Sequence, residues 1–195
     1  MAKTPTQTFF DKAATDPDIA KKSRGWFNKE VVRLRQLRPQ PKALMKQAGR
    51  STRLLPGRLY MFQYEAKGAD TLPYFDQFPL AFPFEIQSDF FLGLNMHYLP
   101  YLLRIRLLDR VMTYASNKKM DDTTRLKFQW SVIKGSSRLA LGRPAVKKYL
   151  KTQVKSQFLQ VNPENWNTAL MLPVERFRGA TRDRVWRESL EIAQS

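Results

Sequence analysis

Lysine side chains recur at a spacing of four residues in the C-terminal half of the chain. Lys147, Lys151 and Lys155 follow one another at this interval, and Lys148 stands beside the first of them. On an α-helix this spacing places the ammonium groups on one face within about two turns. No aspartate or glutamate occurs between residues 143 and 163 to neutralise them. A stripe of this kind is either a solvated helix face or, as we expect here, a surface that binds a chain of phosphates.

A second group of cations lies near the other end of the chain and consists of arginine. A guanidinium group can hold two phosphate oxygens at once, which an ammonium group cannot do. The candidates lie in a predicted basic helix and in the proline-rich connector after it: Arg33, Arg35, Arg38, Arg50 and Arg53. Because the expected contacts are with phosphates, we expect binding that is largely indifferent to base sequence.

The composition of the whole chain points to the same kind of partner. Its 195 residues include 34 Lys+Arg and 17 Asp+Glu, a formal net charge of +17, and the pI is near 10.3. Residues 1–56 hold 13 cations against 4 anions, residues 57–100 hold 2 against 5, and residues 101–195 hold 19 against 8. Two basic flanks around a nearly neutral middle favour a polyanionic partner.

Few residues support catalysis. The chain has no Cys and one His, which excludes thiolate zinc sites, cysteine nucleophiles and polyhistidine metal sites. His97 stands where a predicted strand gives way to a helix, a position typical of a buried or capping hydrogen-bond partner. Glu65 and Lys67 have the Glu-x-Lys spacing of one class of Mg²⁺-dependent nuclease, but no aspartate precedes them on a predicted strand. We expect no catalytic residue, metal, cofactor or small-molecule substrate, and hence no enzymatic activity.

The elements that must position the cations begin with an arm and a helix. Residues 1–22 are expected to form a flexible N-terminal arm, and residues 23–38 a basic amphipathic helix that ends at the prolines after it. Segments rich in aromatic residues predict strands of a small antiparallel sheet over residues 59–64, 80–86 and 91–96. We expect most of these aromatic side chains to pack in the core rather than to stack on bases.

After Pro100 the apolar residues recur at helical spacing. This pattern predicts helices over residues 102–112, 122–133, 144–158, 162–170 and 181–193. The predicted fold class is therefore α+β, with a basic helical N-terminal arm, a small antiparallel β-sheet and a C-terminal cluster of four to five helices. Residues 23–195 would form a single domain, with the sheet at about 57–97 and the helices at about 100–193.

Three blocks of the chain resemble a known family: residues 56–64, 70–80 and 91–100, within a similarity that runs from about Trp26 to Trp186. They are similar to virion-associated proteins of contractile-tailed bacteriophages, namely the phage DNA end protector family. The resemblance implies a non-enzymatic protein that binds the ends of packaged linear double-stranded DNA and shields them from host exonuclease. It brings no catalytic motif and no mapped binding residue.

Two other functions stay open at this point. The chain could be a structural component of the baseplate, tail or neck whose basic faces contact acidic proteins, or a metal-dependent nuclease that uses Glu65. Among these, a DNA-binding virion protein is the function that we expect, with DNA termini and other virion proteins as partners. We expect it in the virion, and in the host cytoplasm during assembly and after entry. No apolar stretch approaches the roughly 20 residues that cross a bilayer, so no membrane partner is expected.

Overall fold

The computed structural model describes residues 32, 36, 40–46, 50–105, 107–108, 130–131, 133–135 and 142–194. The predicted arm over residues 1–22 and most of the predicted basic helix, with Arg33, Arg35 and Arg38, lie outside the described residues. The division of the chain into an arm and one domain therefore stays a prediction.

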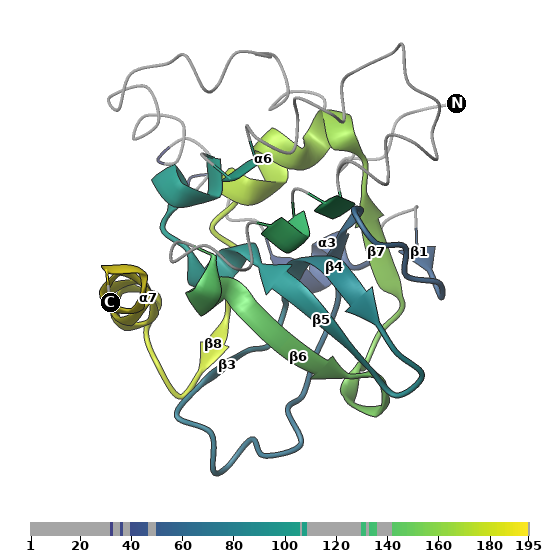
Figure 1. Ribbon diagram of the computed structural model, residues 1–195, viewed down its shortest axis with the longest axis horizontal. Coiled ribbons are helices and arrows are strands. Elements are labelled where there is room, and N and C mark those ends of the chain that lie inside the picture. Colours follow the sequence, from purple (N-terminus) through teal and green to yellow (C-terminus); the bar gives the residue numbers. More distant parts are fainter. Residues whose placement is uncertain are drawn as a thin grey trace.

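Two antiparallel sheets form the body of the protein (Figure 1). The larger has six strands in the order β1-β7-β2-β4-β5-β6, so strands from both ends of the described chain interleave. Its strands are β1 (Arg50–Ser51), β2 (Leu59–Met61), β4 (Leu80–Ile86), β5 (Phe90–Asn95), β6 (Val146–Leu150) and β7 (Phe158–Val161). The smaller sheet pairs β3 (Phe75–Asp76) with β8 (Phe177–Arg178).

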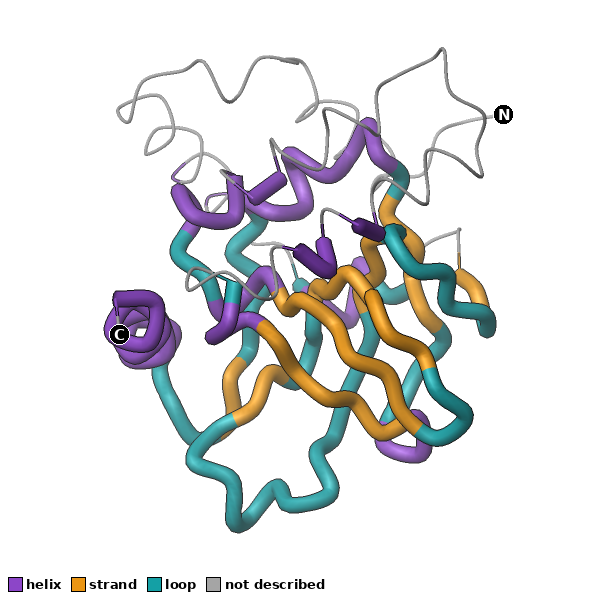
Figure 2. Tube along the Cα trace, viewed as in Figure 1, coloured by secondary structure: helices purple, strands orange, loops and turns teal. Residues whose placement is uncertain are grey.

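Helices are short except for the last, α7 (Arg182–Gln194). The others are α3 (Pro41–Leu44), α6 (Trp166–Met171) and the 3₁₀-helices η2 (Met96–Tyr98), η3 (Arg143–Ala145), η4 (Lys151–Gln153) and η5 (Pro163–Asn165). Residues 101–105, 107–108, 130–131 and 133–135 are also helical. Figure 2 shows α7 at one side of the molecule, away from β1 and β7. The two sides therefore present different surfaces.

The central strands are buried on both faces of the large sheet. Leu59 and Met61 of β2 belong to one core cluster, whereas Tyr60 between them belongs to a second. In the first cluster, Trp166 of α6 is fully buried and its ring lies 5.0 Å from that of Phe82. Burial on both faces explains why β4 begins with five consecutive buried residues instead of alternating with polar ones.

The second cluster shows that the large sheet is strongly curved. Phe62, which follows β2, has its ring centroid 5.1 Å from that of Tyr149 on β6 and 5.3 Å from that of Phe158 on β7. Phe91 of β5 stacks on Tyr149 at 5.1 Å and also lies 6.0 Å from Phe158. Because β6 and β7 are separated by three strands in the sheet order, these rings can meet only if the sheet curls around them.

The predicted strands in the middle of the chain are confirmed, but the predicted fold class is wrong. β2, β4 and β5 lie at the predicted places, and so do the short helical segment η5–α6 and the terminal helix α7. The C-terminal cluster of four to five helices does not form, because residues 146–150 and 158–161 are strands of the large sheet and residues 177–178 a strand of the small one. In the part of the chain that the structure describes, the two antiparallel sheets form the body, and the helices around them are short apart from α7.

The predicted helix over residues 144–158 is wrong for a physical reason. Val146, Leu150, Val154 and Phe158 are four residues apart, a spacing close to one helical turn but also a multiple of the two-residue period of a strand. Residues 146–150 pair with residues 90–94 of β5, and the ring of Tyr149 stacks on Phe91. These contacts with a neighbouring strand favour a strand over a helix, and the local sequence does not reveal them.

Candidate nucleic-acid interface

A hollow of about 510 Å³ lies beside the second core cluster, which contains Phe158 and against which Leu54, Ile86 and Val154 pack. Three segments that are distant in the sequence line it: the loop after β1, the end of β4, and the segment from η4 to the start of β7. Its lining residues are Thr52, Arg53, Leu54, Ile86, Lys151, Val154, Ser156, Gln157 and Phe158. The volume falls in the range of small-molecule sites, roughly 300–1,000 Å³.

The loop after β1 is held by strand pairing and by a local hydroxyl contact. Ser51 is paired with Phe158 across β1 and β7. The Ser51 hydroxyl donates to the carbonyl oxygen of Arg53 at 2.9 Å and accepts from the Arg53 amide at 3.0 Å. Serine in this arrangement closes a tight turn. The turn fixes the backbone of Arg53 and leaves its guanidinium group on the surface.

The other long side of the hollow is anchored to two neighbouring segments. The Lys151 amide donates to the carbonyl oxygen of Asp89 at 2.8 Å, and its ammonium group donates to that of Gln87. The Lys155 amide donates to the carbonyl oxygen of Gln63 at 2.8 Å, and the Gln63 amide donates to the hydroxyl of Ser156 at 2.9 Å. These bonds hold the segment from η4 to β7 between the β4–β5 turn and the end of β2.

Cations around the hollow have no carboxylate partner among the described residues. Among the residues that the structure describes, none of these five forms an ion pair with a carboxylate: Arg50, Arg53, Lys148, Lys151 and Lys155. Three arginines on β8 and α7 differ: Arg178 pairs with Glu65 and Asp70, Arg182 with Glu175 and Asp183, and Arg184 with Glu188. The cations beside the hollow thus have fewer carboxylate partners within the described chain than these three arginines do.

The structure brings some of the predicted binding residues together and separates others. Arg53 and Lys151 line the same hollow, Lys155 adjoins its lining residue Ser156, and Arg50 lies on β1 beside the loop. The expected single stripe of lysines is wrong because the segment is not a helix. Lys147 and Lys148 are adjacent residues of β6, so their side chains leave opposite faces of the sheet. The assignment of these residues to DNA binding stays a prediction.

Lys147 and Lys148 both lie over aromatic rings. The ammonium group of Lys147 is 4.0 Å from the ring centroid of Tyr98, and that of Lys148 is 4.0 Å from the ring centroid of Phe90. Burial lowers the pKa of Lys147 from 10.5 to about 8, while the contact with Tyr98 favours the charged form and opposes this shift. Lys147 is thus a partly buried residue whose ammonium group packs against Tyr98.

We expect Lys147→Met to change how stability depends on pH. Between pH 8 and 10.5 the unfolded chain binds more protons at this residue than the folded chain does, so the wild type gains stability as the pH rises through that window. Methionine does not titrate, so the stability of the variant relative to that of the wild type should fall by about 2 kcal/mol between pH 7 and 9.5. Thermal unfolding of both proteins at the two pH values measures this difference, and parallel pH profiles would contradict the packed position of Lys147.

Several lining residues were not predicted from the sequence. The floor of the hollow is apolar, and Thr52 and Gln157 add a hydroxyl and an amide to its rim; the apolar residues are Leu54, Ile86, Val154 and Phe158. They come from three segments of the chain, and they meet because β7 lies between β1 and β2. No local pattern could have found them, since none of these residue types is unusual where it stands.

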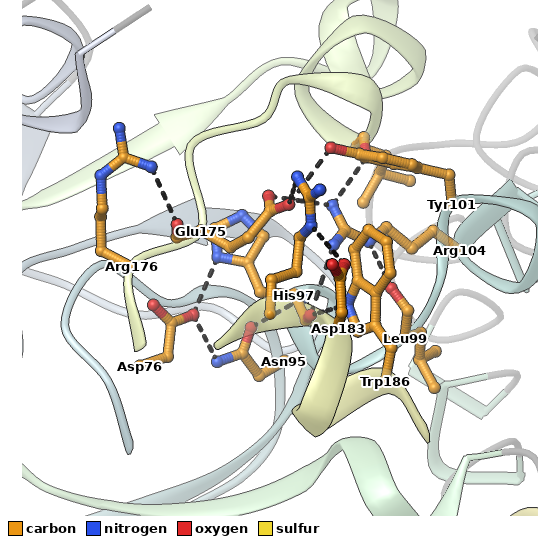
Figure 3. Close-up of polar contacts among 12 residues, drawn as sticks. Asp76, Asn95, His97, Leu99, Tyr101, Arg104, Glu175, Arg176, Asp183 and Trp186 are labelled. Carbon is orange, nitrogen blue, oxygen red and sulfur yellow. Dashed lines mark hydrogen bonds and ion pairs between the residues drawn. The ribbon is translucent and has the colours of Figure 1, made fainter. Parts of the chain in front are cut away.

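A buried polar network lies elsewhere in the molecule, between η2, β3 and the segment that precedes β8 (Figure 3). Nδ1 of His97 donates to Oδ2 of Asp76 at 2.8 Å, and the amide of the Asn95 side chain donates to the same oxygen at 3.0 Å. Both His97 and Asp76 are buried. The prediction that His97 is a buried hydrogen-bond partner is confirmed.

The same network contains a buried ion pair. The side chain of Arg104 is fully buried, with its NH1 atom 3.6 Å from Oε2 of Glu175 and 3.0 Å from the carbonyl oxygen of Leu170. Arg182 of α7 also reaches Glu175, at 3.2 Å. Burial is the largest influence on the pKa of Glu175 and raises it, but Arg104 and the other neighbours, Arg182 among them, together outweigh burial, and the pKa lies below its ordinary value. This cluster ties α7 to the core and has the burial of a structural site.

Among the described residues, no further metal ligand joins the Glu-x-Lys motif. Oε1 of Glu65 accepts from Arg178 at 2.7 Å, and the same guanidinium group binds Asp70 at 3.0 Å. In the part of the chain that the structure describes, no group of three or more His, Asp or Glu residues is placed to hold a metal ion. The carboxylate of Glu65 is thus engaged in an ion pair with Arg178.

No described helix combines the length and apolar character needed to cross a bilayer.

No curated protein and no solved structure matches the chain. A family model described as "Phage T4 terminal DNA protecting protein" matches residues 7–189, which is most of the 195-residue sequence. The match covers both sheets, the hollow and α7 as far as Ser189, in line with the resemblance noted in the sequence. The chain therefore belongs to the phage T4 terminal DNA protecting protein family.

Proposed function

We propose that this protein binds the ends of linear double-stranded DNA, without cleaving them, and shields them from host exonuclease. The observation that carries the proposal is the hollow, where Arg53 and Lys151 border an apolar floor and form no ion pair among the described residues. Family membership supports DNA termini as the target. Exposed cations bind the phosphates of a duplex, and an apolar floor suits the base that only an end exposes.

A role without catalysis is supported by the surroundings of the acidic residues. Glu65 is paired with Arg178, and Asp76 and Glu175 are buried within the polar network. A carboxylate that holds a catalytic metal needs oxygens directed towards the substrate. These three carboxylates are instead directed towards arginine or histidine side chains of the same chain.

We further propose that the protein is carried in the virion with the packaged DNA, contacts other virion proteins there, and acts in the host cytoplasm after entry. An end protector must reach the host together with the ends that it covers, and membership of a phage family supports this path. Mass spectrometry of purified virions tests it, because the protein should be present in particles from which free protein has been removed.

The function is tested by an exonuclease protection assay. We expect most of a linear duplex to keep its full length when the protein is added before the exonuclease, because occupied termini give the enzyme no place to start. Gel electrophoresis of the remaining DNA over time measures the protection. Circular duplex of the same sequence serves as a competitor.

The competitor separates end recognition from general attraction to charge. Circular DNA at the same phosphate concentration should leave protection unchanged, whereas unlabelled linear DNA should remove it. Loss of protection with both competitors would contradict recognition of ends and leave only binding along the duplex.

A further inference from the structure

We propose that the hollow takes up the terminal nucleotide of one DNA strand in an unpaired state, with its base on the apolar floor and its phosphate beside Arg53 and Lys151. This inference rests on the proposed function and adds the form of DNA end that the protein prefers. The hollow has a volume of about 510 Å³ and opens to solvent beside exposed cations. A volume of this size suits a single nucleotide rather than a base pair.

The floor has the character of a surface for a planar ring. Leu54, Ile86, Val154 and Phe158 contribute apolar side chains. The ring of Phe158 is fixed from behind, since it lies 5.3 Å from the ring of Phe62 and 6.0 Å from that of Tyr60. Bases bind apolar and aromatic side chains without regard to sequence, because every base has the same kind of face.

Polar groups on the rim are available to a ligand. Among the described residues, none forms a hydrogen bond with the side chain of Thr52, Arg53 or Gln157. The guanidinium group of Arg53 can hold a phosphate through two bonds. The amide of Gln157 both donates and accepts, so it can bind the edge of a base that has lost its partner. Lys151 already donates to the carbonyl oxygen of Gln87, which leaves two of its three protons for a phosphate.

An unpaired terminal nucleotide fits this site better than an interior one. An interior base is stacked on both sides and paired, and taking it out of the helix costs a few kcal/mol, whereas a frayed terminal base has already lost much of this. A hollow open on one side can receive a nucleotide at the end of a strand without bending the duplex. Selection for ends would then follow from the lower cost of unpairing there, with no contact to a particular base sequence.

Equilibrium binding to three short duplexes of one sequence tests this inference. The first has one mismatched pair at each end, the second is fully paired, and the third is closed at both ends by hairpin loops. We expect the wild type to bind the mismatched duplex at least about tenfold more tightly than the closed one. A 2-aminopurine at the mismatched position should increase in emission on binding as it leaves the base stack.

Gln157→Trp fills the hollow while keeping every cation. Gln157 is exposed and its side chain makes no hydrogen bond to a described residue, so this variant should fold. It should bind mismatched and closed duplexes equally and lose the 2-aminopurine signal. Gln194→Trp makes the same exchange at an exposed residue of α7 and should behave as the wild type does.

The outcomes separate this inference from the proposed function. Retained discrimination in Gln157→Trp, or equal binding of all three duplexes by a wild type that still protects linear DNA, would overturn the inference alone. A wild type that neither binds linear DNA nor protects it would overturn the proposed function, and the inference with it.

Discussion

Replacing Arg53, Lys151 and Lys155 together by glutamate should lower the affinity for linear duplex DNA by more than about 100-fold. Each of these cations lies at the hollow or next to it and forms no ion pair within the described chain. Each phosphate contact releases counterions, so the slope of log affinity against log salt concentration should also become shallower by about 3. Fluorescence anisotropy with a labelled duplex at several salt concentrations measures both quantities.

A matched pair of single variants controls for the loss of charge. Lys155→Glu and Arg187→Glu each reverse one exposed cation, but Arg187 lies on α7, at the opposite side of the molecule (Figure 1). Lys155→Glu should weaken binding clearly more than Arg187→Glu does. Equal effects would mean that only net charge matters, and wild-type affinity in a folded triple variant would remove these residues from the site.

The second large effect concerns stability. Glu175→Gln should lower the free energy of unfolding by about 3–5 kcal/mol, because it leaves the buried cation of Arg104 without its carboxylate. Arg182 of α7 loses the same partner. The expected fall in melting temperature is about 6–20 °C for a chain of this size, measured by circular dichroism at pH 7. Because the glutamine keeps the shape of the side chain, the loss would report on charge rather than on packing.

The control and the pH dependence of this effect follow from the same contacts. Glu188→Gln removes a partly exposed carboxylate that pairs with Arg184 and accepts from the Tyr74 hydroxyl, and it leaves no buried cation unpaired, so it should cost much less stability. The lowered pKa of Glu175 means that its contribution is complete above pH 4.5 and is lost as the pH falls through the folded value. The wild type and Glu175→Gln should therefore converge in stability at low pH, and a constant difference between them would contradict a charged Glu175.

The local sequence predicted correctly those helices and strands whose pattern of apolar residues fits only one type of secondary structure. β4 and β5 are continuous apolar runs bounded by turns, and α7 follows a proper helical period, so residues 80–86, 90–95 and 182–194 were found within one residue. The segment over residues 146–161 was misread because its apolar spacing satisfies two periods at once. Pairing with β5 and with β2, which is a long-range contact, selects the strand.

The candidate site was predictable in its charges but not in its shape. Arg53 and Lys151 were both identified as candidate phosphate-binding cations, yet they were assigned to two separate basic surfaces, and the structure places them on one hollow. Lys147 was assigned to the same stripe as Lys151, although its ammonium group lies over Tyr98. Which lysines face solvent depends on the sheet, and the sheet depends on residues far away in the chain.

The order of strands in the large sheet has a consequence for protein synthesis. β7 lies between β1 and β2 and pairs with both, and among the described strands neither β1 nor β2 pairs with the other. A chain leaves the ribosome from its N-terminus, so Arg53 emerges long before the strand that holds its loop in place. An unfinished chain carries many basic residues, but the strand that positions them has not yet been made. Its binding to nearby RNA or DNA should therefore be weaker and less selective than that of the finished protein.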